Sequence, residues 1–592
     1  MTDSSDGVLL AVRGLRVSYH RGPTATEVVH DIDLDVRPGQ VVALVGESGS
    51  GKSTTAHAVI GLLPTGGRIE AGSVRFAGVD LTALPAAGLR AYRGQEIALV
   101  PQDPTVSLNP VQRIGVQVAE VLRVHGLATR RSAPAAAVAA LARAGLPDPE
   151  LRARQYPHEL SGGMRQRALI AIAFAAEPRL LIADEPTSAL DVTIQRRILD
   201  QMGKMISERG TAVLLITHDL AVAADRADEI VVMSGGHVVE RGTSRQILRD
   251  PSHPYTRRLI SDAPGLALAD VSAASTSPQT PTRTQHEKPQ TTHTVQPRTA
   301  AQSETTIQAS TAQQPDPPPQ EPKPPEPTAL LVVEGLVKDF PLPRTSTGRR
   351  SVRAVDDVSF AIGRGETFAL VGESGSGKST TARLALRLMD PTAGRIHLCG
   401  VDITDLRGAA LRRLRRRMQV VYQNPYASLD PRFSVAEAIE QPLRLFGVGS
   451  RATRRSRVRE LLSQVALPEH LLDRRPAELS GGQRQRVAIA RALSLHPDLV
   501  VCDEPLSALD VTVQAQILDL LASLQTELGL SYLFITHDLA VVRTIADRIG
   551  VMRTGRLVEV ATGEELFDNP RHEYTRELLD AIPGRLSGFS AR

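Results

Sequence analysis

The residues best suited to chemistry in this chain form a phosphate-binding pattern that occurs twice. The stretch ALVGESGSGKSTTA occupies residues 43–56 and recurs, identical at every position, at residues 369–382. Both copies hold the spacing G-x-x-x-x-G-K-[ST], in which small residues let backbone N–H groups approach a polyphosphate, the lysine neutralises its outer phosphates, and the hydroxyl can bind Mg²⁺. The alternative is a turn that merely links a strand to a helix and matches the spacing by chance. Such a chance match is plausible for one copy and much less so for two identical copies.

We therefore predict two P-loops, each followed by a helix whose N-terminal dipole faces the anion. Ser53 and Ser379 are also assigned to the metal. The predicted nucleotide-binding residues are Gly46, Glu47, Ser48, Gly49, Ser50, Gly51, Lys52, Ser53 and Thr54 in the first copy, and Gly372, Glu373, Ser374, Gly375, Ser376, Gly377, Lys378, Ser379 and Thr380 in the second.

A pair of carboxylates ends an apolar run in each half. The run LLIADEP ends in Asp184 and Glu185, and LVVCDEP ends in Asp503 and Glu504. Such a strand delivers its last side chains to the carboxyl edge of an open α/β sheet, where ligands bind. We expect each Asp to hold Mg²⁺ and each Glu to polarise an attacking water. Acidic pairs that only cap the next helix are the alternative.

A histidine ends a further apolar run in each half, His218 in LLITHD and His537 in LFITHD. A single histidine in that position is more often structural. Because it recurs at the same expected sheet edge as the carboxylates, we predict that it senses the terminal phosphate.

A second motif places a serine and two glycines before a helix. The strings ELSGGMRQR and ELSGGQRQR occupy residues 159–167 and 478–486. Without a lysine, this is either another anion-binding helix start or a capped helix after a flexible turn, and the residues alone leave both open.

The two halves are an internal duplication of alternating strands and helices. The motifs LSGG, DEP, SALDVT and ITHDLAV recur at a common offset of 319 residues. Short β-rich runs come first in each half, and apolar runs then alternate with helix-like stretches, which predicts a parallel sheet with helices on both faces. We assign residues 1–265 to a first domain, 266–327 to a flexible linker rich in Pro, Thr and Gln, and 328–592 to a second domain.

Composition narrows the class of protein. The chain of 592 residues lacks Trp, carries a net charge of +4 and has two cysteines, Cys399 and Cys502, which excludes a disulfide framework and any four-cysteine metal site. We expect neither a secretory signal at the N-terminus nor a membrane-spanning run.

The composition of the linker is more typical of a plain spacer than of a proline-rich recognition motif. The arginine run 412–417 suits a solvated helix face better than a nucleic-acid patch.

In order and spacing, the P-loop, LSGG-x-RQR, DEP, SALD and ITHD motifs resemble the nucleotide-binding domains of ATP-binding cassette (ABC) proteins. The resemblance covers both halves. It implies α/β P-loop domains of the ABC type, each with a mixed β core and a helical subdomain, joined by a disordered linker. It also implies two competent ATPase sites with ATP and Mg²⁺ as cofactors, and a head-to-tail pairing in which each ATP lies between one P-loop and the LSGG segment of the other half.

The resemblance assigns further residues to these sites. Lys52 would work with Ser480, Gly481 and Gly482, and Lys378 with Ser161, Gly162 and Gly163. The adenine-stacking aromatic corresponds to Tyr19 and Phe340, the metal-contacting glutamine to Gln102 and Gln423, and the aspartate that communicates between halves to Asp191 and Asp510. One departure is Met164, which stands where the second half has Gln483 and puts the tuning of that site in doubt.

A narrower resemblance concerns the tails DPSHPYTRRLISDAPG and NPRHEYTRELLDAIPG, which are similar to the peptide, nickel and glutathione importer branch. It implies an energy-coupling ATPase at the cytoplasmic face of the cell membrane, with two integral-membrane permease subunits and an extracytoplasmic solute-binding protein as partners, and without the cysteine-rich iron–sulfur extension found in some members. A twin-cassette ATPase acting on ribosomes or DNA, and an exporter or a sugar or metal importer, are the rivals. The sequence does not name the solute or the direction of transport.

Overall fold

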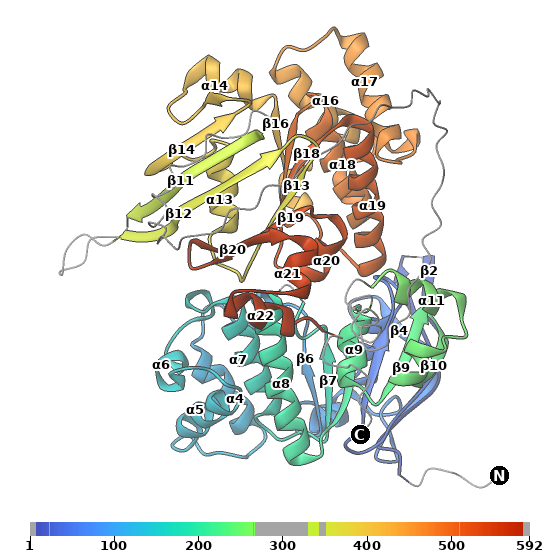
Figure 1. Cartoon of the computed structure of the whole chain (residues 1–592). Helices are drawn as coiled ribbons and strands as arrows, with labels where there is room; N and C mark the ends of the chain where they lie inside the picture. Colours follow the sequence, from blue (N-terminus) through green and yellow to red (C-terminus); the bar gives the residue numbers. More distant parts are fainter. Residues whose placement is uncertain are drawn as a thin grey trace, which may run out of the picture.

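The computed structural model describes residues 7–22, 24–188, 190–263, 266, 329–341, 351–507 and 509–583. The chain forms two similar halves, coloured blue to green and yellow to red in Figure 1. The predicted linker lies outside the described residues except for Leu266, and so do the predicted domain boundaries beside it.

The first half contains two sheets. An antiparallel sheet has the strand order β2-β1-β4-β5, and a larger sheet has the order β10-β9-β3-β8-β7-β6, parallel throughout except at its edge strand β10. The strands are β1 (Leu10–Arg21), β2 (Thr24–Val36), β3 (Val41–Val45), β4 (Gly67–Phe76), β5 (Val79–Asp80), β6 (Ile97–Val100), β7 (Leu180–Asp184), β8 (Ala212–Thr217), β9 (Glu229–Ser234) and β10 (His237–Thr243).

Helices of the first half fall into three groups. They are α1 (Lys52–Val59) after the P-loop and α2 (Ala86–Tyr92); a helical subdomain of α3 (Pro104–Ser107), α4 (Ile114–Val124), α5 (Ala133–Arg143), α6 (Pro149–Ala153) and the 3₁₀ turn η1 (Pro157–Glu159); and α7 (Gly162–Phe174), α8 (Val192–Arg209), α9 (Leu220–Arg226), α10 (Ser244–Arg249) and α11 (Pro254–Ser261).

The second half repeats this plan, with sheets ordered β12-β11-β14-β15 and β16-β17-β18-β13-β19-β20. Its strands are β11 (Ala329–Pro341), β12 (Ser351–Gly363), β13 (Thr367–Val371), β14 (Ala393–Leu398), β15 (Val401–Asp402), β16 (Met418–Val421), β17 (Leu499–Asp503), β18 (Ser531–Ile535), β19 (Arg548–Arg553) and β20 (Arg556–Thr562).

The helices follow in the same order. They are α13 (Lys378–Ala385), α14 (Gly408–Arg415), α15 (Pro425–Ser428), α16 (Val435–Leu445), α17 (Arg451–Gln464), η2 (Glu469–Leu471), η3 (Pro476–Glu478), α18 (Gly481–Leu493), α19 (Val511–Leu528), α20 (Leu539–Ile545), α21 (Gly563–Asp568) and α22 (Glu573–Asp580).

Each large sheet is buried on both faces, which explains why its strands read as continuous apolar runs. Ala43 and Val45 of β3 pack into a core shared with the helical side, whereas Val42 and Leu44 pack into a core shared with α1 and the antiparallel sheet. The expectation of a parallel sheet with helices on both faces therefore needs two corrections. One face is covered mainly by a second sheet, and the edge strand runs antiparallel because the turn between β9 and β10 is too short for a crossover.

The arginine run of the second half belongs to α14 and the turn after it. Several of these side chains are engaged within the protein: Arg412 donates to the Leu445 carbonyl, Arg415 to the Arg387 carbonyl, and Arg417 pairs with Asp498 at 2.5 Å. These bonds anchor α14 to its neighbours. None of the helices in the described ranges is long and apolar enough to cross a lipid bilayer.

Candidate active site

The P-loop of each half leaves the central strand of the large sheet beside a neighbouring strand. A Cβ on Gly46 would lie 2.2 Å from the Met233 carbonyl oxygen of β9, and a Cβ on Gly372 would lie 2.2 Å from the Met552 carbonyl oxygen of β19. Real Cβ atoms do not approach so closely, so only glycine fits where the loop begins. Farther along, Gly49 has a φ of 82° and no atom within 4 Å of its virtual Cβ, which leaves the inside of the loop open to a ligand.

The P-loop lysines are buried, yet they have polar partners. Lys52 is 5% exposed, and its ammonium group donates to the carbonyls of Gly46 and Glu47, both at 2.8 Å. Lys378 is 4% exposed and donates to the carbonyls of Gly372 and Glu373 at 2.7 and 2.8 Å. The loop thus curls round its own lysine and holds a positive charge at its centre.

Burial lowers the pKa of Lys52, while the carboxylates of Glu185, Asp184 and Asp510 favour its charged form. Burial likewise lowers the pKa of Lys378, opposed by Glu504, Asp191 and Asp503. A desolvated ammonium surrounded by carbonyls attracts an anionic ligand more strongly than a solvated one, because little water competes.

The predicted metal ligands lie together at the end of the P-loop. The Ser53 hydroxyl donates to Asp184 Oδ1 at 3.0 Å, and the Ser379 hydroxyl donates to Asp503 Oδ1 at 2.8 Å. Burial raises the pKa of both aspartates. Hydroxyl and carboxylate oxygens at the mouth of a phosphate loop are the donor set that Mg²⁺ uses, keeping its other positions for water and phosphate.

An unsatisfied polar atom in the second P-loop also fits a phosphate ligand. The hydroxyl of Ser376 is buried and has no hydrogen-bond partner among the described residues, whereas the equivalent Ser50 accepts from Lys52 at 3.3 Å. Buried polar atoms are normally satisfied. A phosphate oxygen would satisfy this one.

The predicted water-activating glutamates are each held by two other predicted site residues. Glu185 Oε1 lies 3.0 Å from His218 Nδ1, and its Oε2 accepts from the Gln102 amide at 2.7 Å. In the second half, Gln423 donates to Glu504 Oε2 at 2.6 Å, and His537 Nδ1 lies 3.5 Å from Oε1. Because β6, β7 and β8 are parallel neighbours, the residues that follow them meet at one edge of the sheet.

Charge stabilises the pairing of glutamate and histidine. Burial by itself would raise the pKa of Glu185, but the bond and charge of His218 outweigh it, so the pKa is lowered. Burial would lower the pKa of His218, yet the bond and charge of Glu185 raise it. The same directions hold for Glu504 and His537. The carboxylate is therefore ionised at neutral pH and can orient or deprotonate a water.

These glutamates also carry an uncommon backbone conformation. Glu185 has a φ of 45° and Glu504 a φ of 47°, values in the left-handed region that favours glycine. Such conformations cost about 1–3 kcal/mol and persist where the surroundings impose them. Hydrogen bonds from the Glu185 and Glu504 backbone N–H groups to Ile216 and Ile535, each 2.9 Å long, contribute to that restraint.

The LSGG serines cap the N-termini of helices α7 and α18, and the hydrogen bonds of the cap differ between the two halves. Ser161 accepts from the Met164 N–H at 3.4 Å at the start of α7. Ser480 accepts from the Gln483 N–H at 3.2 Å, and the Gln483 side chain accepts in return from the Ser480 N–H at 2.9 Å, which completes a capping box on α18. The Met164 side chain has no amide oxygen to return this bond, so the start of α7 lacks the second capping bond.

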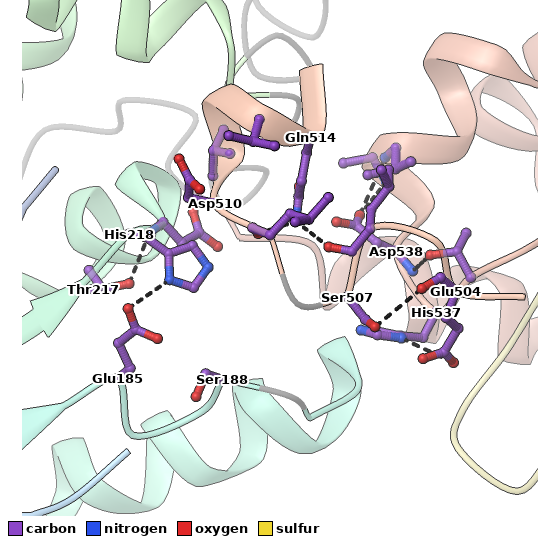
Figure 2. A pocket seen from close by; sticks show the side chains of 18 of the residues that line it. Glu185, Ser188, Thr217, His218, Glu504, Ser507, Asp510, Gln514, His537 and Asp538 are labelled. Carbon is purple, nitrogen blue, oxygen red and sulfur yellow. Dashed lines mark hydrogen bonds and ion pairs between the residues drawn. The ribbon is translucent and has the colours of Figure 1, made fainter. Parts of the chain in front are cut away.

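A cavity of about 850 Å³ lies between the halves and collects residues from both. Figure 2 shows Asp510 of the second half beside His218 of the first, facing the same space as Glu185. The predicted site residues that line the cavity are Glu47, Ser48, Gln102, Glu185 and His218 from the first half, and Ser480, Gly481, Gly482, Glu504, Asp510 and His537 from the second.

The opposite combination is not part of this cavity, whose lining includes neither Ser161, Gly162 and Gly163 nor the second P-loop. A charge of the first half nevertheless reaches the second P-loop. Burial lowers the pKa of Lys378, and the Asp191 carboxylate is among the charges that oppose this shift. The two aspartates that we predict to communicate between the halves also differ. Asp191 caps α8 by accepting from the Ile194 N–H at 3.0 Å, whereas the Asp510 side chain forms no capping bond to the described start of α19.

The predicted adenine-stacking aromatics lie outside that cavity. The Tyr19 hydroxyl is 3.4 Å from the Thr54 hydroxyl, so this ring lies beside the first P-loop helix. Phe340 is 36% exposed, with the Lys338 ammonium 5.6 Å from its ring centre. Both rings are accessible to a planar ligand.

Sequence reasoning missed two residues that contact the P-loops. The Tyr255 hydroxyl accepts from the Glu47 N–H at 2.9 Å, and the Tyr574 hydroxyl accepts from the Glu373 N–H at 3.1 Å. The only signal in the sequence was the recurrence of these tyrosines in the two tails, more than 200 residues from the loops they contact.

Comparisons with known proteins agree with this geometry. The profile of the ABC transporter family matches residues 29–188 and 355–507, which is more than half of the chain. A second profile, described as the oligopeptide/dipeptide transporter C-terminal region, matches residues 239–288 and 558–585.

Characterised relatives match over nearly the whole length. The glutathione import ATP-binding protein GsiA of Salmonella choleraesuis is 42% identical, with 98% of this chain and 90% of that protein aligned. GsiA of Pectobacterium atrosepticum is 42% identical over 97% of this chain and 89% of its own. The oligopeptide transport ATP-binding protein OppD of Mycobacterium tuberculosis is 42% identical over 97% of this chain and 98% of its own.

Exchanging the residues that distinguish the two LSGG helix starts tests the capping difference. We expect Met164→Gln to slow amide hydrogen exchange in the first turn of α7 about two- to fivefold, because a returned hydrogen bond adds roughly 0.5–1 kcal/mol of local stability. The reciprocal control, Gln483→Met, should speed exchange at the start of α18 by a similar factor. Unchanged exchange at both helix starts would contradict the assignment.

Proposed function

The chain belongs to the ABC transporter family, and from that membership we propose that it is the ATP-hydrolysing, energy-coupling subunit of an importer for short peptides or related small solutes. Dipeptides and oligopeptides are the favoured solutes; glutathione and nickel are further candidates. The observation that carries the proposal is that both halves combine a complete set of catalytic residues with the oligopeptide/dipeptide transporter C-terminal region.

Different residues of each half would bind the phosphates, the adenine and the metal ion of ATP–Mg²⁺. The loop N–H groups and Lys52 or Lys378 hold the phosphates, while Tyr19 or Phe340 stacks on the adenine. The metal would be held by Ser53, Gln102 and Asp184 in the first site, and by Ser379, Gln423 and Asp503 in the second. When bound, Mg²⁺ supplies positive charge next to the phosphate oxygens.

Hydrolysis needs a water placed in line with the terminal phosphate. Glu185 and Glu504 are the residues suited to orient that water, because each carboxylate is ionised and directed by two neighbours. His218 and His537 hold the glutamates and lie close enough to contact a terminal phosphate oxygen. The glutamines supply the second bond to each carboxylate and link its position to the start of the helical subdomain.

We further propose that the halves pair head to tail, so that each ATP is shared. The inter-half cavity supports this, because it brings the first P-loop residues Glu47 and Ser48 into one space with Ser480 of the second half. The action of Asp510 on Lys52, and of Asp191 on Lys378, supports it from both directions. The linker keeps the partner half at a high effective concentration without any new contact.

The partners we propose are two integral-membrane permease subunits and, through them, an extracytoplasmic solute-binding protein. The chain itself would then lie at the cytoplasmic face of the cell membrane as a peripheral protein. Two features support this. The full-length relatives are an import and a transport ATP-binding protein. The helical subdomains also carry exposed apolar side chains, Val106 and Val111 in the first half and Tyr426 and Leu445 in the second.

Copurification from gently solubilised membranes tests the proposed role most directly. We expect two integral-membrane proteins to accompany the full chain, and ATP hydrolysis by the isolated complex to rise when the solute-binding protein and its peptide are added. Recovery of ribosomes or DNA in place of membrane proteins would support the rival twin-cassette function and overturn the importer.

Replacing both glutamates tests their role in hydrolysis. We expect the double variant Glu185→Gln/Glu504→Gln to retain ATP and to lose turnover by about 100-fold or more, because glutamine preserves the shape of the site but cannot act as a base. Retained nucleotide and phosphate release are the measurements. Glu208→Gln, the same change at an exposed glutamate in the last turn of α8, serves as the control, and rapid turnover by the double variant would disprove the assignment.

Head-to-tail pairing predicts that each LSGG serine affects the P-loop of the other half. With a photoreactive ATP analogue, we expect Ser480→Ala to reduce labelling of the Lys52 loop about three- to tenfold, and the matched Ser161→Ala to reduce labelling of the Lys378 loop, since each loses one hydrogen bond to the phosphates. The tryptic peptides GPTATEVVHDIDLDVRPGQVVALVGESGSGK, in which the Arg–Pro bond stays intact, and GETFALVGESGSGK distinguish the loops by mass. Labelling lost from the loop of the same half would contradict the pairing.

A further inference from the structure

The C-terminal extension of each half contacts its own P-loop through one tyrosine. Tyr255 on α11 and Tyr574 on α22 accept from the N–H of the second P-loop residue, Glu47 or Glu373, at 2.9 and 3.1 Å. The carbonyl of that same residue accepts from the P-loop lysine at 2.8 Å. A single residue is therefore held from both sides, by the extension through its N–H and by the lysine through its carbonyl.

Hydrogen bonds within each C-terminal extension fix the position of its tyrosine. Glu240 accepts from the Ser252 and His253 N–H groups at 2.7 and 3.1 Å, which fastens the start of α11 to β10. The His253 ring then caps the helix by accepting from the Tyr255 N–H at 3.2 Å. The Glu240 carboxylate and the His253 ring thus fix the helix start that carries Tyr255.

The second half repeats the arrangement. Glu559 accepts from the Arg571 and His572 N–H groups at 2.8 and 3.0 Å, and the His572 ring accepts from the Tyr574 N–H at 3.1 Å. Because the same bonds form in both halves, we take the position of the tyrosine to be a regular feature of this fold and not a peculiarity of one half.

The hydroxyls are shielded and uncharged. Tyr574 is 2% exposed, and the Arg553 guanidinium lies 4.7 Å from its ring centre. Burial raises the pKa of Tyr574 to about 12, and burial also raises the pKa of the half-buried Tyr255. Each oxygen therefore remains a neutral hydroxyl, and its bond to the P-loop N–H is protected from competing water.

The extensions also reach the other half. Besides burial, the Asp510 carboxylate of the opposite half raises the pKa of Tyr255, and Asp191 raises the pKa of Tyr574, so each tyrosine lies within the electrostatic reach of an aspartate of the other half. Figure 1 shows α22 lying against the first half, where Arg196 of α8 donates to the Asp580 carbonyl. The helix that Arg196 belongs to begins directly after Asp191.

We propose that Tyr255 and Tyr574 are positioning residues that hold the entrance of each P-loop in its phosphate-binding shape, so that the ATP affinity of each site depends on the C-terminal extension of its own half. This inference rests on the proposed ATPase function. Without the hydroxyl acceptor, the peptide unit that joins Gly46 to Glu47, or Gly372 to Glu373, is free to rotate. The Gly46 or Gly372 carbonyl, which accepts from the lysine, lies in that same planar unit and rotates with it. ATP then has to reorder the loop when it binds.

The test replaces each tyrosine by phenylalanine, which removes the acceptor and keeps the ring. For Tyr255→Phe, Tyr574→Phe and the double variant of the full chain, we expect the KM for ATP to rise about three- to tenfold with kcat changed less than twofold, the usual scale for one lost hydrogen bond. Calorimetric titration with ATP should show the same loss of affinity.

Tyr532→Phe is the matched control. Tyr532 is 1% exposed, and its hydroxyl donates to the Leu521 carbonyl at 3.0 Å, far along the chain from either P-loop contact. This variant loses one buried hydrogen bond and should lower Tm without changing the KM for ATP.

The outcomes separate cleanly. Unchanged KM and unchanged ATP affinity in Tyr255→Phe and Tyr574→Phe would overturn the proposal, and so would a fall in kcat and Tm alone, the pattern of the control. If the unmodified chain bound ATP without hydrolysing it, the proposed enzymatic function would fail, and the calorimetric titration would still decide the role of the tyrosines.

Discussion

Each nucleotide site depends on a buried lysine that is kept charged by the carbonyls of its own loop. Lys52 and Lys378 are almost without solvent, and the loop bends round them because Gly46 and Gly372 pass within contact of a neighbouring strand. Burial alone would favour the neutral amine. The carbonyl ring and the nearby carboxylates oppose that tendency, so the field for a polyphosphate exists before the ligand arrives. Such preorganisation is what makes electrostatic stabilisation effective.

Around this centre the structure assembles groups from four neighbouring parallel strands. The P-loop follows β3, and Asp184 and Glu185 stand at the end of β7. His218 follows β8, and Gln102 follows β6. Their meeting is a consequence of parallel pairing, which sets all carboxyl ends at one edge. The strained backbone at Glu185 and Glu504 shows that this edge imposes a conformation that these residues would not otherwise adopt.

The halves are duplicated but not equivalent. The capping box on α18 has no counterpart on α7, Asp191 caps its helix while Asp510 does not, and the Ser376 hydroxyl lacks the partner that Ser50 has. The first two differences lie at helix starts, and the third lies in the P-loops. The duplicated motifs are therefore hydrogen-bonded differently in the two halves.

The sequence by itself predicted the candidate residues of each site, because the P-loop, the DEP and ITHD endings and the LSGG segment are local patterns, each with its residues close together in the chain. The sequence also predicted the strands that precede these motifs, since a short apolar run with polar residues at one end is typical of a buried strand that ends at the edge of a sheet. It did not determine that an antiparallel sheet covers one face of the core, or that Tyr255 and Tyr574 bond to loops more than 200 residues away. Only the tertiary structure decided those points, because a single hydrogen bond between distant segments leaves no periodicity or spacing in the sequence.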